Sequence, residues 1–263
     1  MITRIITGIV ALAVFVAVIL AGETVFKIAI TAISLFMLYE LYGAITKSKA
    51  VKVSGFVSAI LLTVGIYFDM FEMFLVAAII IAMLFLIFLH SKATYSEVLS
   101  AQLMAVYVTL FMSYIPRLGS EMGGAVMALI FIIAWGSDTA AYFCGTFLGK
   151  HKLIPKVSPK KTVEGSVGAV IITALLCAGY ILILDKTGYI TADSSMYIGI
   201  AVIGAVASAL SQFGDLAASA IKRDCDIKDY GKIFPGHGGF MDRFDSVIFI
   251  APVVYYLCKF IIM

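Results

Sequence analysis

The chain contains nine apolar stretches, each about long enough to cross a lipid bilayer as a helix. A spanning helix needs roughly 20 predominantly apolar residues. Backbone groups inside a bilayer must pair within the protein, and every stretch here is far longer than a strand of a membrane barrel. The sequence therefore predicts an all-α, polytopic membrane bundle of about nine helices, over residues 5–21, 25–42, 53–68, 70–89, 97–115, 122–143, 165–184, 197–221 and 244–262.

Composition points to the same class of protein. Of the 263 residues, 62% are hydrophobic and 13% are charged, whereas charged residues make up roughly a quarter of a soluble domain. The sequence contains no soluble domain, low-complexity tract or convincing internal repeat. We therefore expect one membrane domain over residues 1–263, in which residues 1–120 form a helical scaffold and residues 121–263 carry the helices and cytoplasmic loops with the candidate functional residues.

Basic residues predict the orientation of the bundle. Lys and Arg accumulate in the cytoplasmic segments of membrane proteins. With a cytoplasmic N-terminus, fifteen of the 19 Lys and Arg residues fall in cytoplasmic segments and the other four fall outside. This orientation places two polar loops, residues 150–161 and 219–246, on the cytoplasmic face. The same bias accounts for most of the net charge of +3, which gives no reason to expect a nucleic-acid partner.

A polar stripe runs along the stretch 197–221 and continues into the following loop. At about 100° per residue, its five side chains fall within an arc of about 80° on a helix. Small hydroxyl groups commonly hydrogen-bond between membrane helices, which explains the serines of the stripe within the bilayer. An ionisable residue in a span is costly and marks a functional site or a nearby cation. The stripe consists of Ser208, Ser211, Asp215, Ser219 and Lys222.

Two more aspartates begin the last apolar stretch. Asp242 and Asp245 are three residues apart, so that both carboxylates can share one face of a helix. Together with Asp215 they offer three oxygen ligands of the kind that Mg²⁺ takes alongside substrate phosphates. The alternative is that Asp242 and Asp245 only complement the positive end of the helix dipole.

A glycine-rich segment precedes these aspartates. In Pro235-Gly236-His237-Gly238-Gly239 the backbone N–H groups can approach an anion closely, and the N-terminus of the following helix adds positive potential. Basic residues are interleaved with aspartates around it. This mixture suits a metal ion with a polyphosphate better than an anionic membrane surface. The basic residues are Lys222, Arg223, Lys228, Lys232 and Arg243.

Several motifs together carry a family resemblance. The C-terminal ones are Ser219-x-x-Lys222-Arg223, Lys228-Asp229, the segment Pro235 to Gly239, and Asp242-Arg243-Phe244-Asp245. The upstream ones are Trp135-x-x-Asp138-Thr139-x-Ala141-Tyr142 and Ser158-Pro159-Lys160-Lys161-Thr162-x-Glu164-Gly165. They resemble the motifs of the phosphatidate cytidylyltransferase family, also called CDP-diacylglycerol synthases. Residues 1–120 match that family only in being hydrophobic spans.

The resemblance implies transfer of a cytidylyl group from CTP to phosphatidic acid, which gives CDP-diacylglycerol and pyrophosphate for phospholipid synthesis. It also implies Mg²⁺, with room for a second cation, and a homodimer. A phosphate monoester with a second pKa near ~6 is largely ionised at neutral pH, so that it needs no strong general base. The protein then supplies mainly position and charge neutralisation.

Each candidate residue has an expected role. By the family pattern, Asp215, Asp242 and Asp245 hold the metal. The triphosphate and the leaving pyrophosphate fall to Ser219, Lys222, Arg223, Lys228, Lys232, Arg243 and the glycines Gly236, Gly238 and Gly239. Lys160 and Lys161 either grip the lipid phosphate or bind anionic lipid in general. Asp138 is a ligand, an orienter of these lysines or a structural hydrogen-bonding residue, and His237 either contacts the nucleotide or fills a turn.

Two other functions remain as alternatives. A CTP-dependent polyprenol or dolichol kinase shares the membrane and the nucleotide, but its alcohol substrate needs a base. A transporter also carries Asp and Lys within the membrane, yet transporters usually bind their substrate near the midplane. The polar residues here gather at one face instead. The short chain favours a bacterial inner membrane, with the active site near the cytoplasmic face.

Overall fold

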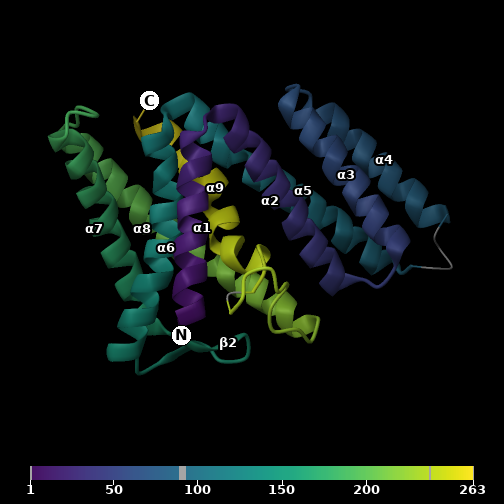
Figure 1. The fold of residues 1–263 in the computed structure, drawn as a ribbon. Coiled ribbons are helices and arrows are strands. Elements are labelled where there is room, and N and C mark those ends of the chain that lie inside the picture. Colours follow the sequence, from purple (N-terminus) through teal and green to yellow (C-terminus); the bar gives the residue numbers. More distant parts are fainter. Residues whose placement is uncertain (1, 89–92, 237, 263) are drawn as a thin grey trace. The chain divides into compact units, whose positions relative to one another are not determined.

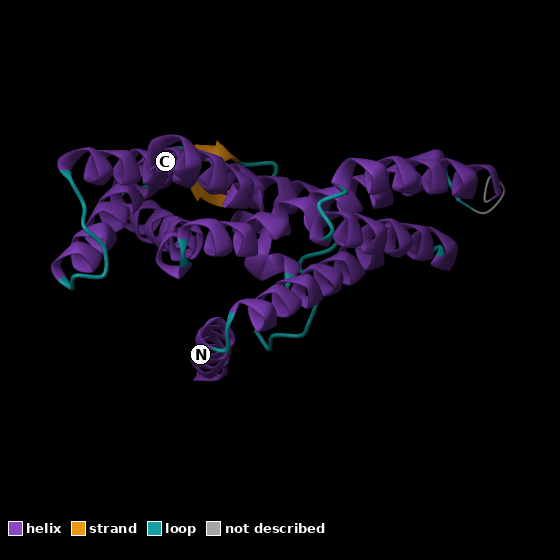
Figure 2. Cartoon of the chain, turned by 90° about the horizontal axis from the view of Figure 1, so that it is seen from above, coloured by secondary structure: helices purple, strands orange, loops and turns teal. Residues whose placement is uncertain are grey.

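The computed structural model describes residues 2–88, 93–236 and 238–262, and these form nine helices and one short two-stranded sheet (Figures 1 and 2). Each predicted stretch corresponds to one helix, and the all-α class is confirmed. Within the described residues, α2 to α9 are long and apolar enough to span a membrane. The elements are α1 (Ile2–Leu20), α2 (Glu23–Ile45), α3 (Lys49–Tyr67), α4 (Phe71–Phe88), α5 (Tyr95–Met122), α6 (Gly124–Phe147), β1 (Lys152–Ile154), β2 (Ser158–Thr162), α7 (Val163–Lys186), α8 (Ser194–Asp224) and α9 (Met241–Ile262).

The chain divides into two compact units. The first unit comprises Met1–Arg117 and Asp224–Phe244, and the second comprises Leu118–Arg223 and Asp245–Met263. The loop after α8 therefore belongs with the N-terminal helices, although it is distant from them in sequence. The expectation of a single membrane domain stays a prediction.

The helices of the first unit pack through glycines and buried hydroxyl groups. In Figure 1, α3 and α4 run side by side, and a Cβ atom at Gly65 would lie 2.7 Å from Cβ of Phe74. The fully buried Tyr42 of α2 donates a hydrogen bond to the Ala101 carbonyl of α5 at 3.1 Å. Backbone carbonyls within a helix already accept one bond, so this second bond ties α2 to α5 at a fixed depth.

In the second unit, α6 and α7 pack closely along their length. A Cβ atom at Gly165 would lie 2.8 Å from the Ala141 carbonyl oxygen, which shows how near the two backbones come. Gly204 of α8 packs in the same way on Cys177 of α7, and Gly214 of α8 packs on Phe249 of α9. Small residues permit such close helix contacts, which stabilise membrane bundles through van der Waals packing.

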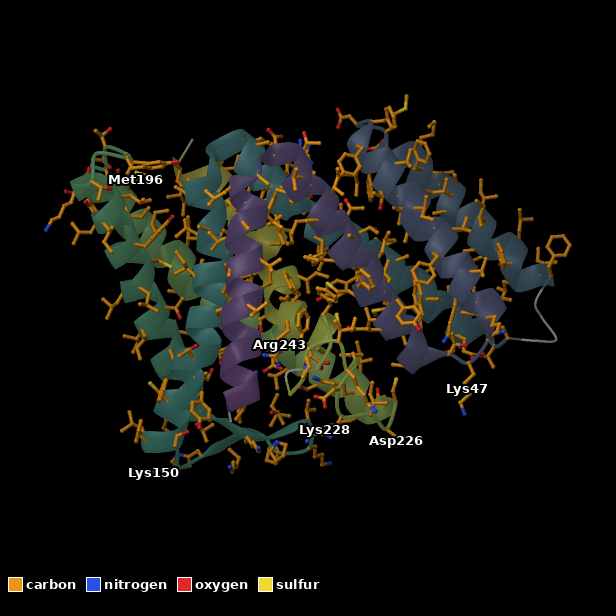
Figure 3. The ribbon with its side chains drawn as sticks, in the orientation of Figure 1. Lys47, Lys150, Met196, Asp226, Lys228 and Arg243 are labelled. Atoms are coloured by element: carbon orange, nitrogen blue, oxygen red, sulfur yellow. The ribbon has the colours of Figure 1, made fainter. Side chains whose placement is uncertain are left out.

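A β-hairpin joins α6 to α7, where the sequence predicted only a polar loop (Figure 2). Strands β1 and β2 pair in antiparallel register, with Lys152 opposite Thr162. Thr162 then caps α7, because its hydroxyl accepts the N–H of Gly165 at 3.1 Å. The end of the hairpin is thereby fixed to the start of the next helix. In Figure 3, Lys150 lies at one end of the second unit and Met196 lies at the other.

Candidate active site

Three carboxylates of the second unit come from three different helices. We call Asp138 of α6, Asp215 of α8 and Asp245 of α9 the carboxylate cluster. Asp245 is only 8% exposed, and it interacts electrostatically with Asp215, Asp138 and Lys222. Ser246 connects two of the acids, because its hydroxyl donates to Asp138 Oδ2 at 3.4 Å and its N–H donates to Asp245 Oδ1 at 2.8 Å. Mutually repelling acids of this kind are stabilised by cations.

Lys161 supplies one of these cations. Its Nζ lies 2.6 Å from Asp215 Oδ2 and donates to the Gln212 carbonyl at 3.3 Å. The amide of Gln212 in turn donates to the Ser166 carbonyl of α7 at 3.2 Å. The half-buried Lys161 is therefore attached to α8, whereas the neighbouring Lys160 is exposed. The two adjacent lysines thus have different surroundings, which the sequence did not reveal.

The serines of the polar stripe have different environments. The Ser208 hydroxyl lies 2.8 Å from that of Ser137 on α6, which confirms the expected interhelical hydrogen bond. The buried hydroxyl of Ser211 makes no such bond with any described residue. Ser219 donates to Asp215 Oδ1 at 3.4 Å, so that it supports the carboxylate cluster. Further along α8, Arg223 Nε makes a 3.5 Å contact with the Val157 carbonyl of the hairpin.

Glu164 shapes the segment that leads into the hairpin. Its carboxylate accepts the N–H of Lys150 at 3.0 Å and of His151 at 3.2 Å. The same carboxylate lies 2.6 Å from His151 Nδ1. The glutamate of the upstream motif thus orders the backbone before β1.

The first unit holds the glycine-rich loop, residues 230–241. Asp242 Oδ2 accepts the N–H of Tyr230 at 2.8 Å and of Gly239 at 3.0 Å, which closes the loop on itself. Phe234 donates its N–H to the Gly238 carbonyl at 2.9 Å. Gly236 has φ 76° and Gly238 has φ 83°, values that only glycine adopts without strain. His237, a predicted nucleotide contact, lies outside the described residues.

Glu40 is the residue that sequence reasoning missed. It lies in α2, and its two carboxylate oxygens accept the N–H groups of Phe240 at 3.1 Å and Met241 at 2.8 Å. Together, Glu40 and Asp242 therefore take three consecutive N–H groups at the start of α9. These three N–H groups are already bound by carboxylates of the protein. They are therefore not free to bind a ligand anion, contrary to what we expected from the glycine-rich sequence. An ionisable residue inside an apolar stretch was the available signal.

The basic residues of the glycine-rich loop and its flank face outward. Lys228, Lys232 and Arg243 are all exposed, and Figure 3 labels Lys228 before the loop and Arg243 at the start of α9. Exposed ammonium and guanidinium groups remain accessible to an anionic ligand. The structure thus divides the predicted site residues between the two units. The first unit holds those from Lys228 to Arg243, and the second unit holds Asp245 and all those that precede Asp224 in the sequence.

Comparison with known proteins identifies the chain's relatives. The model of the family described as "Cytidylyltransferase family" matches residues 2–261. This protein belongs to the cytidylyltransferase family. A protein of Bacillus subtilis named phosphatidate cytidylyltransferase is 32% identical over 97% of this chain and 96% of its own length. Proteins of the same name from Staphylococcus aureus and Staphylococcus saprophyticus are 32% and 31% identical over 95% of this chain and 96% of theirs.

The acids of this cytidylyltransferase family member suit a hard divalent cation. Asp138, Asp215 and Asp245 offer only oxygen donors, which is the ligand type that Mg²⁺ takes. No group of three or more His, Cys, Asp or Glu side chains within the described ranges is arranged to hold a metal ion by itself. Mg²⁺ usually binds through one or two carboxylates and completes its shell with water and substrate phosphates. Among the described residues these carboxylates alone therefore form no metal site, and a bound Mg²⁺ would need further ligands from water or substrate.

Proposed function

We propose that this protein transfers the cytidylyl group of CTP to phosphatidic acid, forming CDP-diacylglycerol and pyrophosphate for phospholipid synthesis. Similarity over almost the full chain to proteins named phosphatidate cytidylyltransferase carries this proposal. The nucleotidyltransferase class follows from the family. Eight helices of membrane-spanning length among the described residues agree with a substrate that stays in the bilayer.

The proposed reaction needs charge neutralisation more than proton transfer. An oxygen of the lipid phosphate attacks the α-phosphorus of CTP, and the bond from the α-phosphorus to the bridging oxygen of the β-phosphate breaks. The attacking phosphate is already ionised at neutral pH, so that no side chain has to remove a proton. Four or more negative charges must nevertheless approach one another. Correct positioning of the two substrates and neutralisation of their charge by cationic groups therefore provide most of the rate acceleration.

The proposed metal is Mg²⁺, with Asp215 and Asp245 as ligands, Asp138 beside them and Asp242 as the third predicted ligand. When bound, the ion would neutralise phosphate oxygens of CTP, and a second cation would add to this effect. Asp215 already has a cationic partner in Lys161 at 2.6 Å, which supports its role in a site that gathers positive charge. Asp242 also organises the glycine-rich loop, so that both of its functions need testing.

We propose separate phosphate contacts for the basic residues. Lys160 and Lys161 of β2 would contact the lipid phosphate, because the hairpin and the end of α8 meet through the contacts of Lys161 and Arg223. Lys222, Arg223, Lys228, Lys232 and Arg243 would contact the triphosphate, with Ser219, Gly236 and Gly238 beside them, whereas the N–H of Gly239 already binds Asp242. A guanidinium group binds phosphate oxygens in pairs, which favours the two arginines for the leaving pyrophosphate.

The proposed location is a bacterial inner membrane, with the active site near the cytoplasmic face and two copies of the chain forming a homodimer. The bacterial relatives and the distribution of Lys and Arg support the location, and the dimer rests on the family resemblance alone. A reporter fused after Lys156 should be cytoplasmic and one fused after Thr187 external, because α7 lies between them. Finding both reporters on one side would contradict the orientation.

CTP labelled at either the α-phosphate or the γ-phosphate provides a direct test of which group is transferred. With purified full-length protein, phosphatidic acid and Mg²⁺, label from α-labelled CTP should enter the lipid and label from γ-labelled CTP should enter pyrophosphate. A polyprenol offered in parallel should receive no label. Entry of γ-label into a lipid would instead identify a lipid kinase and would reject cytidylyl transfer. A protein that consumes no CTP at all would favour the transporter alternative.

A further inference from the structure

Glu40 is a buried acid of α2, upstream of the motifs by which the sequence resembles the family. It is 5% exposed, and the residues it contacts lie 200 positions further along the chain. Both of its carboxylate oxygens accept backbone N–H groups, one from Phe240 and one from Met241. These two groups belong to the unpaired donors that every helix N-terminus leaves. A buried carboxylate is tolerated where such donors and the positive helix end compensate for lost hydration.

Two glycines leave the space that this carboxylate occupies. A Cβ atom at Gly239 would meet both oxygens of Glu40, and one at Gly231 would meet Glu40 Oε1 directly. Neither glycine has a positive φ, so the close approach of Glu40, not the backbone conformation, is what requires glycine here. The glycines at positions 231 and 239 are thus matched to a side chain on α2.

Aromatic contacts fix the same junction from the side. The ring of Phe240 stacks on Phe36 of α2 with 5.4 Å between centroids, and Phe234 packs edge-on against Phe240 at 4.8 Å. Phe36 precedes Glu40 by one helical turn, so that one face of α2 contacts the loop through both an apolar and an acidic group. The loop therefore takes its position from α2 as well as from its own hydrogen bonds.

We propose that Glu40 is a positioning residue for the reaction, which sets the glycine-rich loop and thereby the basic groups of Lys232 and Arg243. This inference rests on the proposed function, because those basic groups matter only if a triphosphate binds. Glu40 touches neither substrate nor metal in this role. It acts by holding the two N–H groups that begin α9, immediately before Asp242 and Arg243. The N-terminal helices then have a part in catalysis that their composition does not reveal.

The first test is Glu40→Gln in the full-length protein. The amide has one acceptor oxygen in place of two, and its NH₂ group faces a backbone donor. We expect kcat for cytidylyl transfer to fall between about 10-fold and 100-fold, since small displacements of positioning groups have effects of this size. The KM for phosphatidic acid should change less than about twofold, because the proposed lipid contacts lie on β2. Amide hydrogen exchange at Phe240 and Met241 should accelerate at least about tenfold.

A matched control comes from the same helix. Ser34 is as buried as Glu40, but its hydroxyl donates to the Ile30 carbonyl within α2. Ser34→Ala should leave kcat, KM and the exchange of both amides within about twofold of the wild-type values. Wild-type kcat and unchanged amide exchange in Glu40→Gln would overturn the proposal. A loss of activity equal in Ser34→Ala would also overturn it, because the effect would then be general destabilisation of α2.

A double-mutant cycle decides the matter even if Glu40→Gln does not fold. Gly239→Ala should lower kcat in the wild-type background, because its methyl group collides with the Glu40 carboxylate. The same substitution should have a smaller effect in Glu40→Asp, whose shorter side chain leaves room. Such non-additivity is the signature of a shared contact. Additive losses would show that the two residues act independently and would overturn the proposal.

The outcomes separate this inference from the proposed function. If wild-type protein transfers no α-label to phosphatidic acid while Glu40→Gln loosens the amides of Phe240 and Met241, cytidylyl transfer is rejected and the positioning of the loop stands. If wild-type protein transfers the label and the amides and kcat of Glu40→Gln are unchanged, cytidylyl transfer stands and the role of Glu40 is rejected.

Discussion

The glycine-rich loop of the first unit and the carboxylate cluster of the second unit use acidic side chains in different ways. In the loop, Glu40 and Asp242 accept four backbone N–H groups between them. In the cluster, Asp215 faces the ammonium group of Lys161, and Asp245 lies within the fields of two other acids and of Lys222. Acids of the first kind determine the shape of a backbone. Acids of the second kind determine how much positive charge a region holds.

This difference separates two tasks that a phosphate-transfer site requires. A carboxylate bound to backbone N–H groups has partners that cannot leave, and its removal changes geometry. A carboxylate paired with a lysine has a partner that a metal ion can replace or accompany, and its removal changes charge. Substitution of Asp by Asn distinguishes the two cases, because the amide keeps a hydrogen-bond acceptor but loses the negative charge.

The largest effect should come from the carboxylate cluster. Asp215→Asn and Asp245→Asn should each lower kcat by on the order of 100-fold or more, because loss of a charged ligand weakens a divalent site. Circular dichroism and thermal unfolding should show folded protein. The matched control is Asp193→Asn, since Asp193 accepts the Met196 N–H at the start of α8 and asparagine caps helices equally well. Full activity of Asp215→Asn, or turnover without divalent metal, would reject the proposed metal site.

Asp242→Asn tests whether one residue belongs to both classes. A single amide oxygen can still accept the N–H groups of Tyr230 and Gly239, as Asp242 Oδ2 does. If Asp242 is also a metal ligand, kcat should fall by about 100-fold while the exchange of the Gly239 amide stays within about twofold. Retained turnover would remove Asp242 from the metal set and leave it as a residue that organises the loop.

The fold was predictable because apolar length determines where membrane helices form. The ends of the helices were less predictable, since polar residues extend a helix beyond its apolar part. The stretch predicted over residues 97–115 is the helix Tyr95–Met122, which continues through Arg117 and Glu121. The hairpin of β1 and β2 was not predicted, because its short polar strands depend on contacts with Glu164 and α7.

The candidate site was predictable where its residues lie close together in sequence. The spacing of the last aspartates and the glycines located the loop, yet it suggested an anion site built from N–H groups. Glu40 changes that interpretation, and no local pattern links it to residues 200 positions away. Likewise, adjacent Lys160 and Lys161 look equivalent in the sequence, and only the packing of β2 near α8 distinguishes them.

The smallest effect should distinguish these two lysines. Lys161→Ala removes the half-buried ammonium group 2.6 Å from Asp215 and leaves that carboxylate beside other acids. Lys160→Ala removes an exposed charge, which solvent and salt already screen. We expect kcat/KM for phosphatidic acid to fall about tenfold more in Lys161→Ala than in Lys160→Ala, because loss of a partly buried charge pair costs more than loss of an exposed one.

Lys161→Arg should recover part of the loss, and Lys156→Ala, also an exposed position in the hairpin segment, should stay within about twofold of wild type. Equal losses in Lys160→Ala and Lys161→Ala would mean that the hairpin acts only through its total charge. The ion pair between Lys161 and Asp215 would then not explain why the carboxylate cluster functions differently from the acids of the glycine-rich loop.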